Sequence, residues 1–274
     1  MEYPIDYHMH LERAGITRGN AMRFIERAME VGISEVAFTE HSHNFVETAG
    51  LLRQPGFVSR HGHRFSADDY VDLALGLKRE GLPVRLGIEF DYIEESSDAI
   101  AEFLKRHPWD VVLGSVHWLG DWGFDISPES WNGRQVEDAY RRYFTIATRA
   151  VGSGIFDVLG HPDVIKVFGA RPGPDFEPEL LHLYDDLISA AARTGTCLEL
   201  SSAGLRRPVG EAYPDARLLA RAKAGGVGIT LASDAHEPDD VGSRFAEIVA
   251  IARDSGYSEV TGFQGRRRRA VALS

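Results

Sequence analysis

Cysteine is nearly absent from this sequence: among 274 residues there is one, Cys197. A single thiol cannot form an intramolecular disulfide, and it cannot supply the clustered thiolates of a structural zinc site. No apolar run approaches the roughly 18 residues that a membrane-spanning helix needs, and the first residues lack the basic and apolar segments of a secretory signal. These absences predict a cytoplasmic protein that makes no membrane contact.

Basic residues are also scarce, with 30 lysines and arginines against 41 aspartates and glutamates and a formal net charge of −11. Binding to nucleic acid usually requires a basic surface, so this balance argues against a nucleic-acid partner. The local exception, Arg266 to Arg269, is expected to be a solvated surface, with partner or phosphate contacts as the alternative. An acidic balance also fits carboxylates that are held as ligands of divalent cations.

Short runs rich in Val, Ile and Leu alternate with segments of helical periodicity. The expected strands are 4–8, 35–39, 84–89, 111–116, 156–160, 196–200, 227–232 and 259–262, and helices are expected near 22–29, 134–151, 178–194, 213–224 and 243–255. Continuous apolar runs are typical of parallel strands buried on both faces. The alternation predicts a closed α/β barrel of one domain, residues 1–274, with a long loop at 45–68 and an open sheet as the alternative.

Histidines and carboxylates follow almost every expected strand. They are His8, His10, Glu40, His41, His43, Glu89, Asp91, His117, His161, Asp163, Glu199, Asp234 and His236. Because the carboxyl ends of barrel strands face one side, these side chains are expected to meet at one mouth. Each alone is more often structural, although the alternation of an extended chain does put His8 and His10 on one face.

The residue types indicate which cofactors to expect. Imidazoles and carboxylates without thiolate suit Zn, Mn or Fe, and the number of candidate ligands predicts two or three divalent ions. Cations held close together can clamp a phosphate oxygen and lower the pKa of a bound water. We therefore expect a metal-dependent phosphatase with a small phosphorylated substrate. A non-catalytic metal-binding barrel is the alternative, against which the retention of all these donors argues.

Seven motifs also resemble a known family. They are DYHMH (6–10), FTEHS (38–42), GIEFDY (87–92), GSVHW (114–118), GHPD (160–163), SAGLRRP (202–208) and SDAH (233–236). Their types and order resemble the PHP (polymerase and histidinol phosphatase) family, and within it the monofunctional histidinol-phosphatases. The resemblance implies a distorted (β/α)7 TIM-like barrel with three metal ions that hydrolyses L-histidinol phosphate in histidine biosynthesis. A related phosphoesterase acting on a nucleotide, sugar or phosphotyrosine is the alternative.

The resemblance also implies roles for individual residues. One ion would take His8, His10, Glu89 and Asp234; a second would take Glu89, His117 and His161; a third would take His41, His236 and Glu12. Glu12 stands where many relatives have histidine or aspartate, and His43 is the reserve ligand. Arg206, Lys166 and His43 would bind the substrate phosphate, with surface ion pairs as the alternative for the two cations. Asp234, His236 and Arg206 would act in catalysis.

Overall fold

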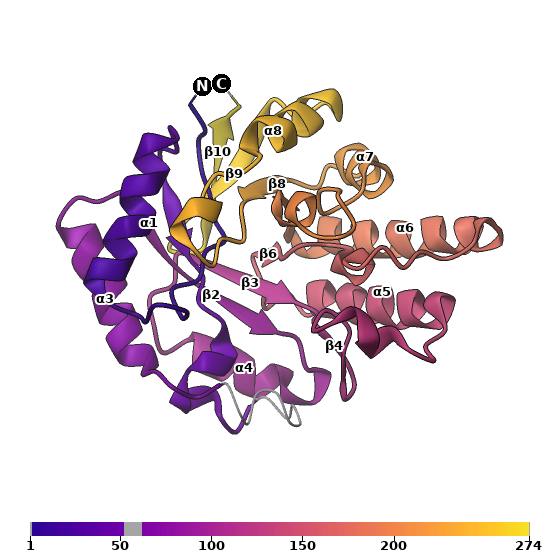
Figure 1. Ribbon diagram of the computed structural model, residues 1–274, viewed down its shortest axis with the longest axis horizontal. Coiled ribbons are helices and arrows are strands. Elements are labelled where there is room, and N and C mark those ends of the chain that lie inside the picture. Colours follow the sequence, from indigo (N-terminus) through magenta and orange to yellow (C-terminus); the bar gives the residue numbers. More distant parts are fainter. Residues whose placement is uncertain (1, 52–61, 274) are drawn as a thin grey trace.

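A curved parallel sheet forms the centre of the molecule in the computed structural model, which describes residues 2–51 and 62–273 (Figure 1). Its strands are Val36–Phe38 (β1), Val84–Asp91 (β2), Val111–Ser115 (β3), Val158–Leu159 (β6), Cys197–Ser201 (β7) and Ile229–Ala232 (β8). They lie in the order β1-β2-β3-β6-β7-β8, and every neighbouring pair is parallel. Nearly all of their residues are buried, as the continuous apolar runs predict.

The N-terminal segment lies between the two edges of this sheet. Isolated parallel bridges join Asp6 to Val36 of β1, and Met9 to Ala235 just beyond β8. The segment is too irregular to count as a strand, although one was expected at 4–8, yet it occupies the position of a seventh one. The arrangement is a distorted TIM-like barrel, so the expected fold class is confirmed.

Seven α-helices lie around the outside of the sheet in the described part of the chain (Figure 1). They are Arg18–Glu30 (α1), Ala67–Arg79 (α3), Ser97–Leu104 (α4), Val136–Gly152 (α5), Glu177–Thr194 (α6), Ala216–Ala224 (α7) and Phe245–Asp254 (α8). In α1 the side chain of Thr17 caps the first turn, and Ala21, Phe24, Ile25 and Ala28 form the buried stripe. None of the helices in the described ranges could span a bilayer. The cytoplasmic location stays a prediction.

Short 3₁₀ turns connect several of these elements. They are Ser42–Asn44, Val46–Thr48, Glu94–Ser96, Pro128–Trp131, Val164–Lys166, Pro174–Phe176, Ala203–Arg206 and Pro238–Asp240. The first ends just before the expected loop 45–68, the second falls at its start, and α3 begins at its end. Residues 52–61 of that loop lie outside the described residues.

The C-terminal strand is a correction to the expected barrel. Glu259–Gln264 (β9) does not join the parallel sheet but pairs antiparallel with Arg267–Ala272 (β10). Positive φ angles at Gly265 (54°) and Arg266 (62°) turn the chain back on itself, which an apolar run cannot reveal. The basic run is also more than a solvated surface, because Arg266 pairs with Asp157 at 2.9 Å and Arg269 pairs with Glu35.

A second hairpin was not expected. Trp118–Leu119 (β4) and Trp122–Gly123 (β5) pair antiparallel between β3 and α5. Strands of two residues show no alternating pattern, so sequence reasoning has no signal for them. The hairpin starts one residue after His117, and it therefore forms part of the wall around the candidate site.

Candidate metal centre

The histidines expected at one mouth do lie together at the carboxyl ends of the strands. The ring of His10 lies 4.9 Å from that of His8, 3.9 Å from that of His41 and 4.4 Å from that of His236, measured between centroids. On the other side, the rings of His117 and His161 lie 4.8 Å apart. Residues from both ends of the chain thus share one small volume.

The backbone turns sharply where two of the strands end. His161 has a φ of 25°, Asp163 of 65° and Asp234 of 52°, all in the region that residues other than glycine rarely adopt. Such strained positions persist only where the surrounding structure imposes them, and they are frequent at functional sites. Here they aim the side chains that follow β6 and β8.

The first ligand group combines the N-terminal histidines with two carboxylates. Nε2 of His10 lies 3.3 Å from Oδ1 of Asp234 and 3.7 Å from Oε2 of Glu89, and the corresponding distances for His8 are 3.8 and 3.5 Å. All four side chains are buried or nearly so. The atoms face one another closely enough to surround a single cation.

Glu89 joins this group to a second one. Its Oε1 lies 3.0 Å from Nε2 of His161 and 3.8 Å from Nε2 of His117, and the two imidazole nitrogens are 3.2 Å apart. One carboxylate with two oxygens directed at different groups is the arrangement expected of a bridging ligand. This matches the bridging role that the resemblance implies.

The third group is closer to the surface. Ligand atoms of His10, His41 and His236 lie within 4.8 Å of one another. Nε2 of His236 is 3.7 Å from Oε1 of Glu12, so Glu12 does reach the place at which a substitute ligand is needed. His43 stacks on His41, with ring centroids 4.8 Å apart, and so lies beside the group.

Several buried atoms in these groups lack a partner. His8 Nε2 and His10 Nε2 have no hydrogen bond within the described ranges, and both face Oε2 of Glu89, which lies 2.6 Å from Nδ1 of His41. An unsatisfied buried polar atom costs about 1–3 kcal/mol, so such atoms are rare unless something binds them. Two imidazole nitrogens and a carboxylate oxygen that face one another form a donor set for a divalent cation. The residues present therefore fit a bound metal.

The pKa shifts of the buried groups also indicate that the site requires bound cations. Burial alone would lower the pKa of His8, but the carboxylates of Glu199 and Glu89 raise it well above its usual value. Burial would raise the pKa of Asp234, yet the neighbouring imidazoles hold it well below its usual range. In both cases buried carboxylates require positive charge beside them. Divalent cations would supply that charge and leave the histidines as neutral ligands.

Further carboxylates hold the ligand histidines in place. Oε2 of Glu199 lies 2.7 Å from Nδ1 of His8, while its Oε1 accepts the backbone N–H of His161 at 3.1 Å. Oδ1 of Asp91 lies 2.7 Å from Nδ1 of His117. A carboxylate on the second nitrogen of a metal-binding imidazole fixes its orientation and its tautomer. Sequence reasoning noted Glu199 and Asp91 at strand ends but assigned them no role.

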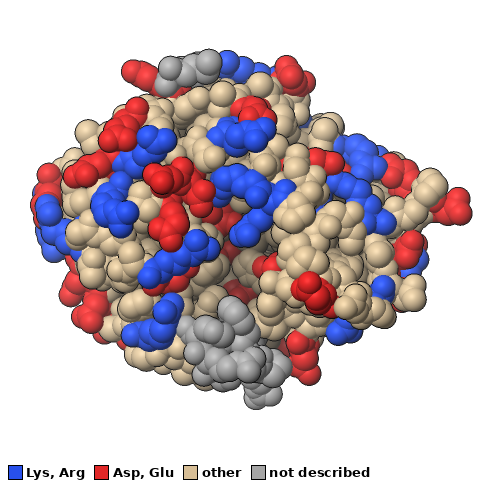
Figure 2. Space-filling model, in the orientation of Figure 1, with Lys and Arg blue, Asp and Glu red and all other residues tan. Residues whose placement is uncertain are grey.

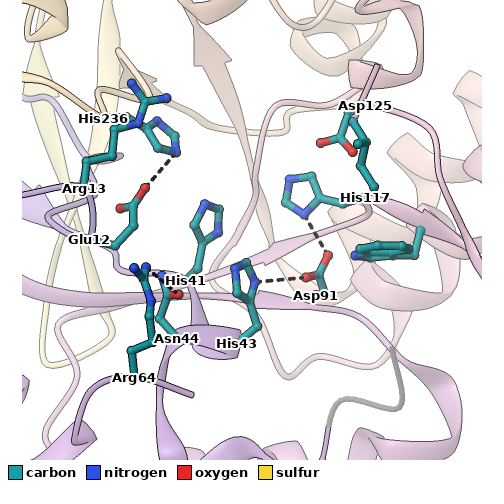
Figure 3. A pocket seen from close by; sticks show the side chains of 12 residues that line it. Glu12, Arg13, His41, His43, Asn44, Arg64, Asp91, His117, Asp125 and His236 are labelled. Carbon is teal, nitrogen blue, oxygen red and sulfur yellow. Dashed lines mark hydrogen bonds and ion pairs between the residues drawn. The ribbon is translucent and has the colours of Figure 1, made fainter. Parts of the chain in front are cut away.

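A pocket of about 520 Å³ opens over the ligand groups. It is lined by Glu12, Arg13, His41, His43, Asn44, Arg64, Asp91, His117, Trp118, Asp125, Ile126 and His236 (Figure 3). Arg13 and Arg64 are cations that sequence reasoning missed, since neither lies at a strand end. The only available signal was that Arg13 directly follows Glu12.

The structure places the predicted phosphate ligand Lys166 elsewhere. The left-handed turn at Asp163 starts a 3₁₀ turn, and Lys166, three residues on, folds back on the Asp163 carboxylate at 2.9 Å. Its ammonium also donates to the carbonyl of Ala212 at 2.9 Å, and the side chain is 1% exposed. It lines a separate small pocket beside Tyr140. The phosphate role expected for Lys166 is therefore not supported.

Arg206 also differs from expectation, because it does not line the pocket over the ligand groups. It donates to the carbonyl of Ser233 at 2.8 Å and pairs with Asp240 at 3.3 Å. These contacts brace the turn that carries Asp234. The residue lies beside the centre, with its guanidinium directed at the backbone.

A TIM-like barrel whose strand ends present imidazoles and carboxylates to one pocket defines a hydrolase that uses divalent metal ions. The family is shown by direct comparison: the model of the PHP domain matches residues 6–203. The chain belongs to the PHP domain family.

Individual relatives agree with this assignment. The probable histidinol-phosphatase of Deinococcus radiodurans is 34% identical over 266 residues, covering 93% of this chain and 95% of that protein. The histidinol-phosphatase of Bacillus subtilis is 26% identical, covering 86% and 95%. A crystal structure of histidinol phosphate phosphatase from Lactococcus lactis, complexed with Zn, L-histidinol and phosphate, superposes with a TM-score of 0.80 at 21% identity and covers 98% of this chain and 100% of its own.

Proposed function

We propose that this protein is a metal-dependent histidinol-phosphatase that hydrolyses L-histidinol phosphate to L-histidinol and phosphate. The observation that carries the proposal is the set of buried ligand atoms that face one another beneath an open pocket, His8 Nε2, His10 Nε2 and Glu89 Oε2. The names of relatives that cover nearly the whole chain support the substrate. The enzyme class and the substrate thus rest on independent observations.

The metal ligands follow from the three groups. His8, His10, Glu89 and Asp234 would hold one ion, Glu89 with His117 and His161 a second, and His41, His236 and Glu12 a third. Zn, Mn or Fe suits this mixture of nitrogen and oxygen donors. When bound, such ions polarise a phosphoryl oxygen and make water a strong nucleophile at neutral pH.

The chain's own side chains bind and orient the substrate. Arg13 and Arg64 both line the pocket, and a guanidinium fork matches the oxygens of a phosphate group. Burial lowers the pKa of His43 to about 3, so its imidazole would meet the phosphate as a neutral hydrogen-bond donor. These three residues would hold the phosphoryl group against the ligand groups.

The residues of the turn after β8 would act on the attacking water and the metal rather than on the phosphate. His236 lines the pocket and Asp234 lies against His10 beside it, so both would place the attacking water as well as hold metal. Arg206 would keep Asp234 in position through its bond to the Ser233 carbonyl. Its expected role thus becomes chiefly one of positioning.

Figure 2 shows acidic and basic side chains interspersed over one face of the molecule, with a hollow near its centre. A mixed surface of this kind suits a small phosphorylated substrate better than a polymeric one. The absence of a nucleic-acid partner stays a prediction, as does the oligomeric state.

The test is phosphate release by purified protein loaded with Zn or Mn. The substrate panel would contain L-histidinol phosphate, a nucleoside monophosphate, a sugar phosphate and phosphotyrosine, compared by kcat/KM. L-histidinol phosphate should be preferred by at least about tenfold, as the names of the relatives lead us to expect. No phosphate release, or a preference for another member of the panel, would contradict the proposal.

A further inference from the structure

The wall of the pocket carries opposite charges in different places. Arg13 and Arg64 project from one side, and the carboxylate of Asp125 lies across the pocket from them, beside His117 (Figure 3). The arginines and metal ions would account for the phosphate of a substrate. They leave the function of an acidic group on the opposite wall unexplained.

The carboxyl of Asp125 is hydrogen-bonded to its own backbone amide and lies near the imidazoles of His117 and His161, but no side chain in the described ranges pairs with it directly. No Lys, Arg or His side chain in the described ranges forms an ion pair with its carboxylate, although Asp91 and His117 nearby are paired with each other at 2.7 Å. The residue is half-buried, and burial raises the pKa of its carboxyl. A partly desolvated carboxylate that forms no ion pair with a lysine or arginine gains from a ligand that brings a positive charge into contact with it.

Hydrogen bonds and packing hold the segment that carries Asp125 in a defined position in the pocket wall. The amide of Phe124 donates to the carbonyl of His117 at 3.4 Å, and the carbonyl of Phe124 accepts the indole N–H of Trp131 at 2.8 Å. A Cβ atom at Gly123 would come within 2.5 Å of the side chain of Ile126, so glycine lets that side chain pack against the turn. The turn therefore holds Asp125 against the pocket.

The chemistry of the proposed substrate offers a cation at the required end. L-histidinol phosphate carries a primary ammonium group on the carbon next to the one that bears the phosphate ester. With the phosphoryl group held by the arginine side and the ligand groups, the leaving alcohol must extend toward another wall of the pocket. An ammonium group there would meet the unpaired carboxylate.

We propose that Asp125 is a specificity-determining residue that binds the ammonium group of the leaving alcohol. This inference rests on the proposed function. It assigns Asp125 to recognition of the substrate and gives it no part in bond cleavage. Phosphate esters without an ammonium group therefore gain nothing from this residue.

The test pairs a protein variant with a substrate variant. We would measure kcat/KM of the wild type and of Asp125→Asn on L-histidinol phosphate and on 3-(imidazol-4-yl)propyl phosphate, which lacks the amine. Asp125→Asn should lose about 10- to 100-fold on L-histidinol phosphate, mainly through KM, as expected for one charged hydrogen bond. On the analogue it should lose less than about threefold. Asp121→Asn, an exposed acid on the same hairpin that lies outside this pocket, is the matched control.

Each other outcome has a definite meaning. An equal loss on both substrates would make Asp125 a general acid or a folding residue and would overturn the inference, as would no loss on either. A measurement without a variant guards against misfolding: L-histidinol should inhibit the wild type about tenfold better than its analogue without the amine, and equal inhibition would contradict the assignment. Failure of the proposed function would show separately, as a wild type that is inactive on L-histidinol phosphate.

Discussion

The two ends of the barrel both gather charged side chains, but they satisfy them differently. At the amino end, the acids just before three strands each receive a basic partner: Glu35 pairs with Arg85 and Arg269, Asp110 with Lys78, and Asp157 with Arg266. At the carboxyl end, Nε2 of His8 and Nε2 of His10 have no hydrogen bond within the described ranges. Each acid at the amino end thus has a cation from the chain itself, whereas the ligand atoms at the carboxyl end leave positions for a bound cation.

The hairpin of β9 and β10 explains why the amino end is closed. Its turn lies across the strand starts, where the amide of Gly265 donates to Asp110 at 3.0 Å and Arg266 reaches Asp157. None of the described residues of this hairpin lines the pocket on the other side. Substitutions at the carboxyl end should therefore lower activity, whereas substitutions at the amino end should lower stability.

The largest effect is expected from removing a ligand at the carboxyl end. His117→Ala should lower kcat/KM for L-histidinol phosphate on the order of 10⁴-fold, because it removes a metal ligand and with it several kcal/mol of transition-state stabilisation. The measurement is steady-state phosphate release together with the metal content of each protein. His182→Ala, an exposed histidine on α6, is the control and should keep full activity. A His117→Ala variant that stays active and keeps its full metal content would contradict the claim that the carboxyl end binds the metal ions needed for activity.

The Lys166→Met variant tests whether the buried ammonium group of Lys166 stabilises the fold or binds the substrate. Lys166→Met leaves the buried Asp163 carboxylate without its partner and should lower the free energy of unfolding by about 3–5 kcal/mol, with KM for L-histidinol phosphate changed less than about threefold. Denaturant titration and kinetics would measure both. A large rise in KM at unchanged stability would restore the phosphate role that the sequence suggested.

The decrease in the free energy of unfolding caused by Lys166→Met should also depend on pH. Burial raises the pKa of Asp163 to about 7. This value lies above the unfolded value of about 3.9, so the stability that protonation contributes is full below about pH 4 and is lost as pH rises through 7. The destabilisation by Lys166→Met should therefore be larger at pH 8 than at pH 5. Equal losses at both values would show that Asp163 does not titrate in this range.

Glu199 tests whether the carboxylates behind the ligands matter. Glu199→Gln keeps the shape of the side chain but removes the negative charge that faces Nδ1 of His8. The change should lower activity or metal affinity about 10- to 100-fold. Added Zn or Mn should restore part of the activity, because the defect lies in metal binding. Glu259→Gln on the exposed edge of β9 is the control. A loss that excess metal does not relieve would indicate a different role for Glu199.

The smallest effect is expected at the amino end. Arg266→Met removes a partly exposed ion pair to Asp157 and should lower stability by about 1 kcal/mol, which corresponds to a Tm decrease of roughly 2–4 °C. Since the change lies far from the pocket, kcat/KM should be unchanged. A substantial loss of activity without a loss of stability would contradict the division between the two ends.

The sequence predicts the parallel sheet well because buried strands have continuous apolar runs. The strand expected at 84–89 is Val84–Asp91, and that expected at 196–200 is Cys197–Ser201. The run at 259–262 looks the same, yet it belongs to the antiparallel hairpin, because direction depends on the turn at Gly265. Local pattern alone therefore cannot distinguish a barrel strand from an edge hairpin.

The candidate site is predictable to a similar extent. Residues at strand ends, such as His8 and Asp234, can be placed because a barrel brings all strand ends to one side. Arg13, Arg64 and Asp125 lie in connecting segments without periodicity, where nothing in the sequence indicates direction. Lys166 was misplaced for a related reason, since the left-handed turn at Asp163 determines where its side chain points.

The central claim is that the unpartnered donors at the carboxyl end hold the metal ions that the phosphatase uses. Anomalous scattering from crystals of the active protein, collected at the Zn and Mn absorption edges, tests it most directly. We predict two or three peaks, one between His8, His10 and Asp234 and one between Glu89, His117 and His161. Fully active crystals with no anomalous peak beside Glu89 would contradict the account.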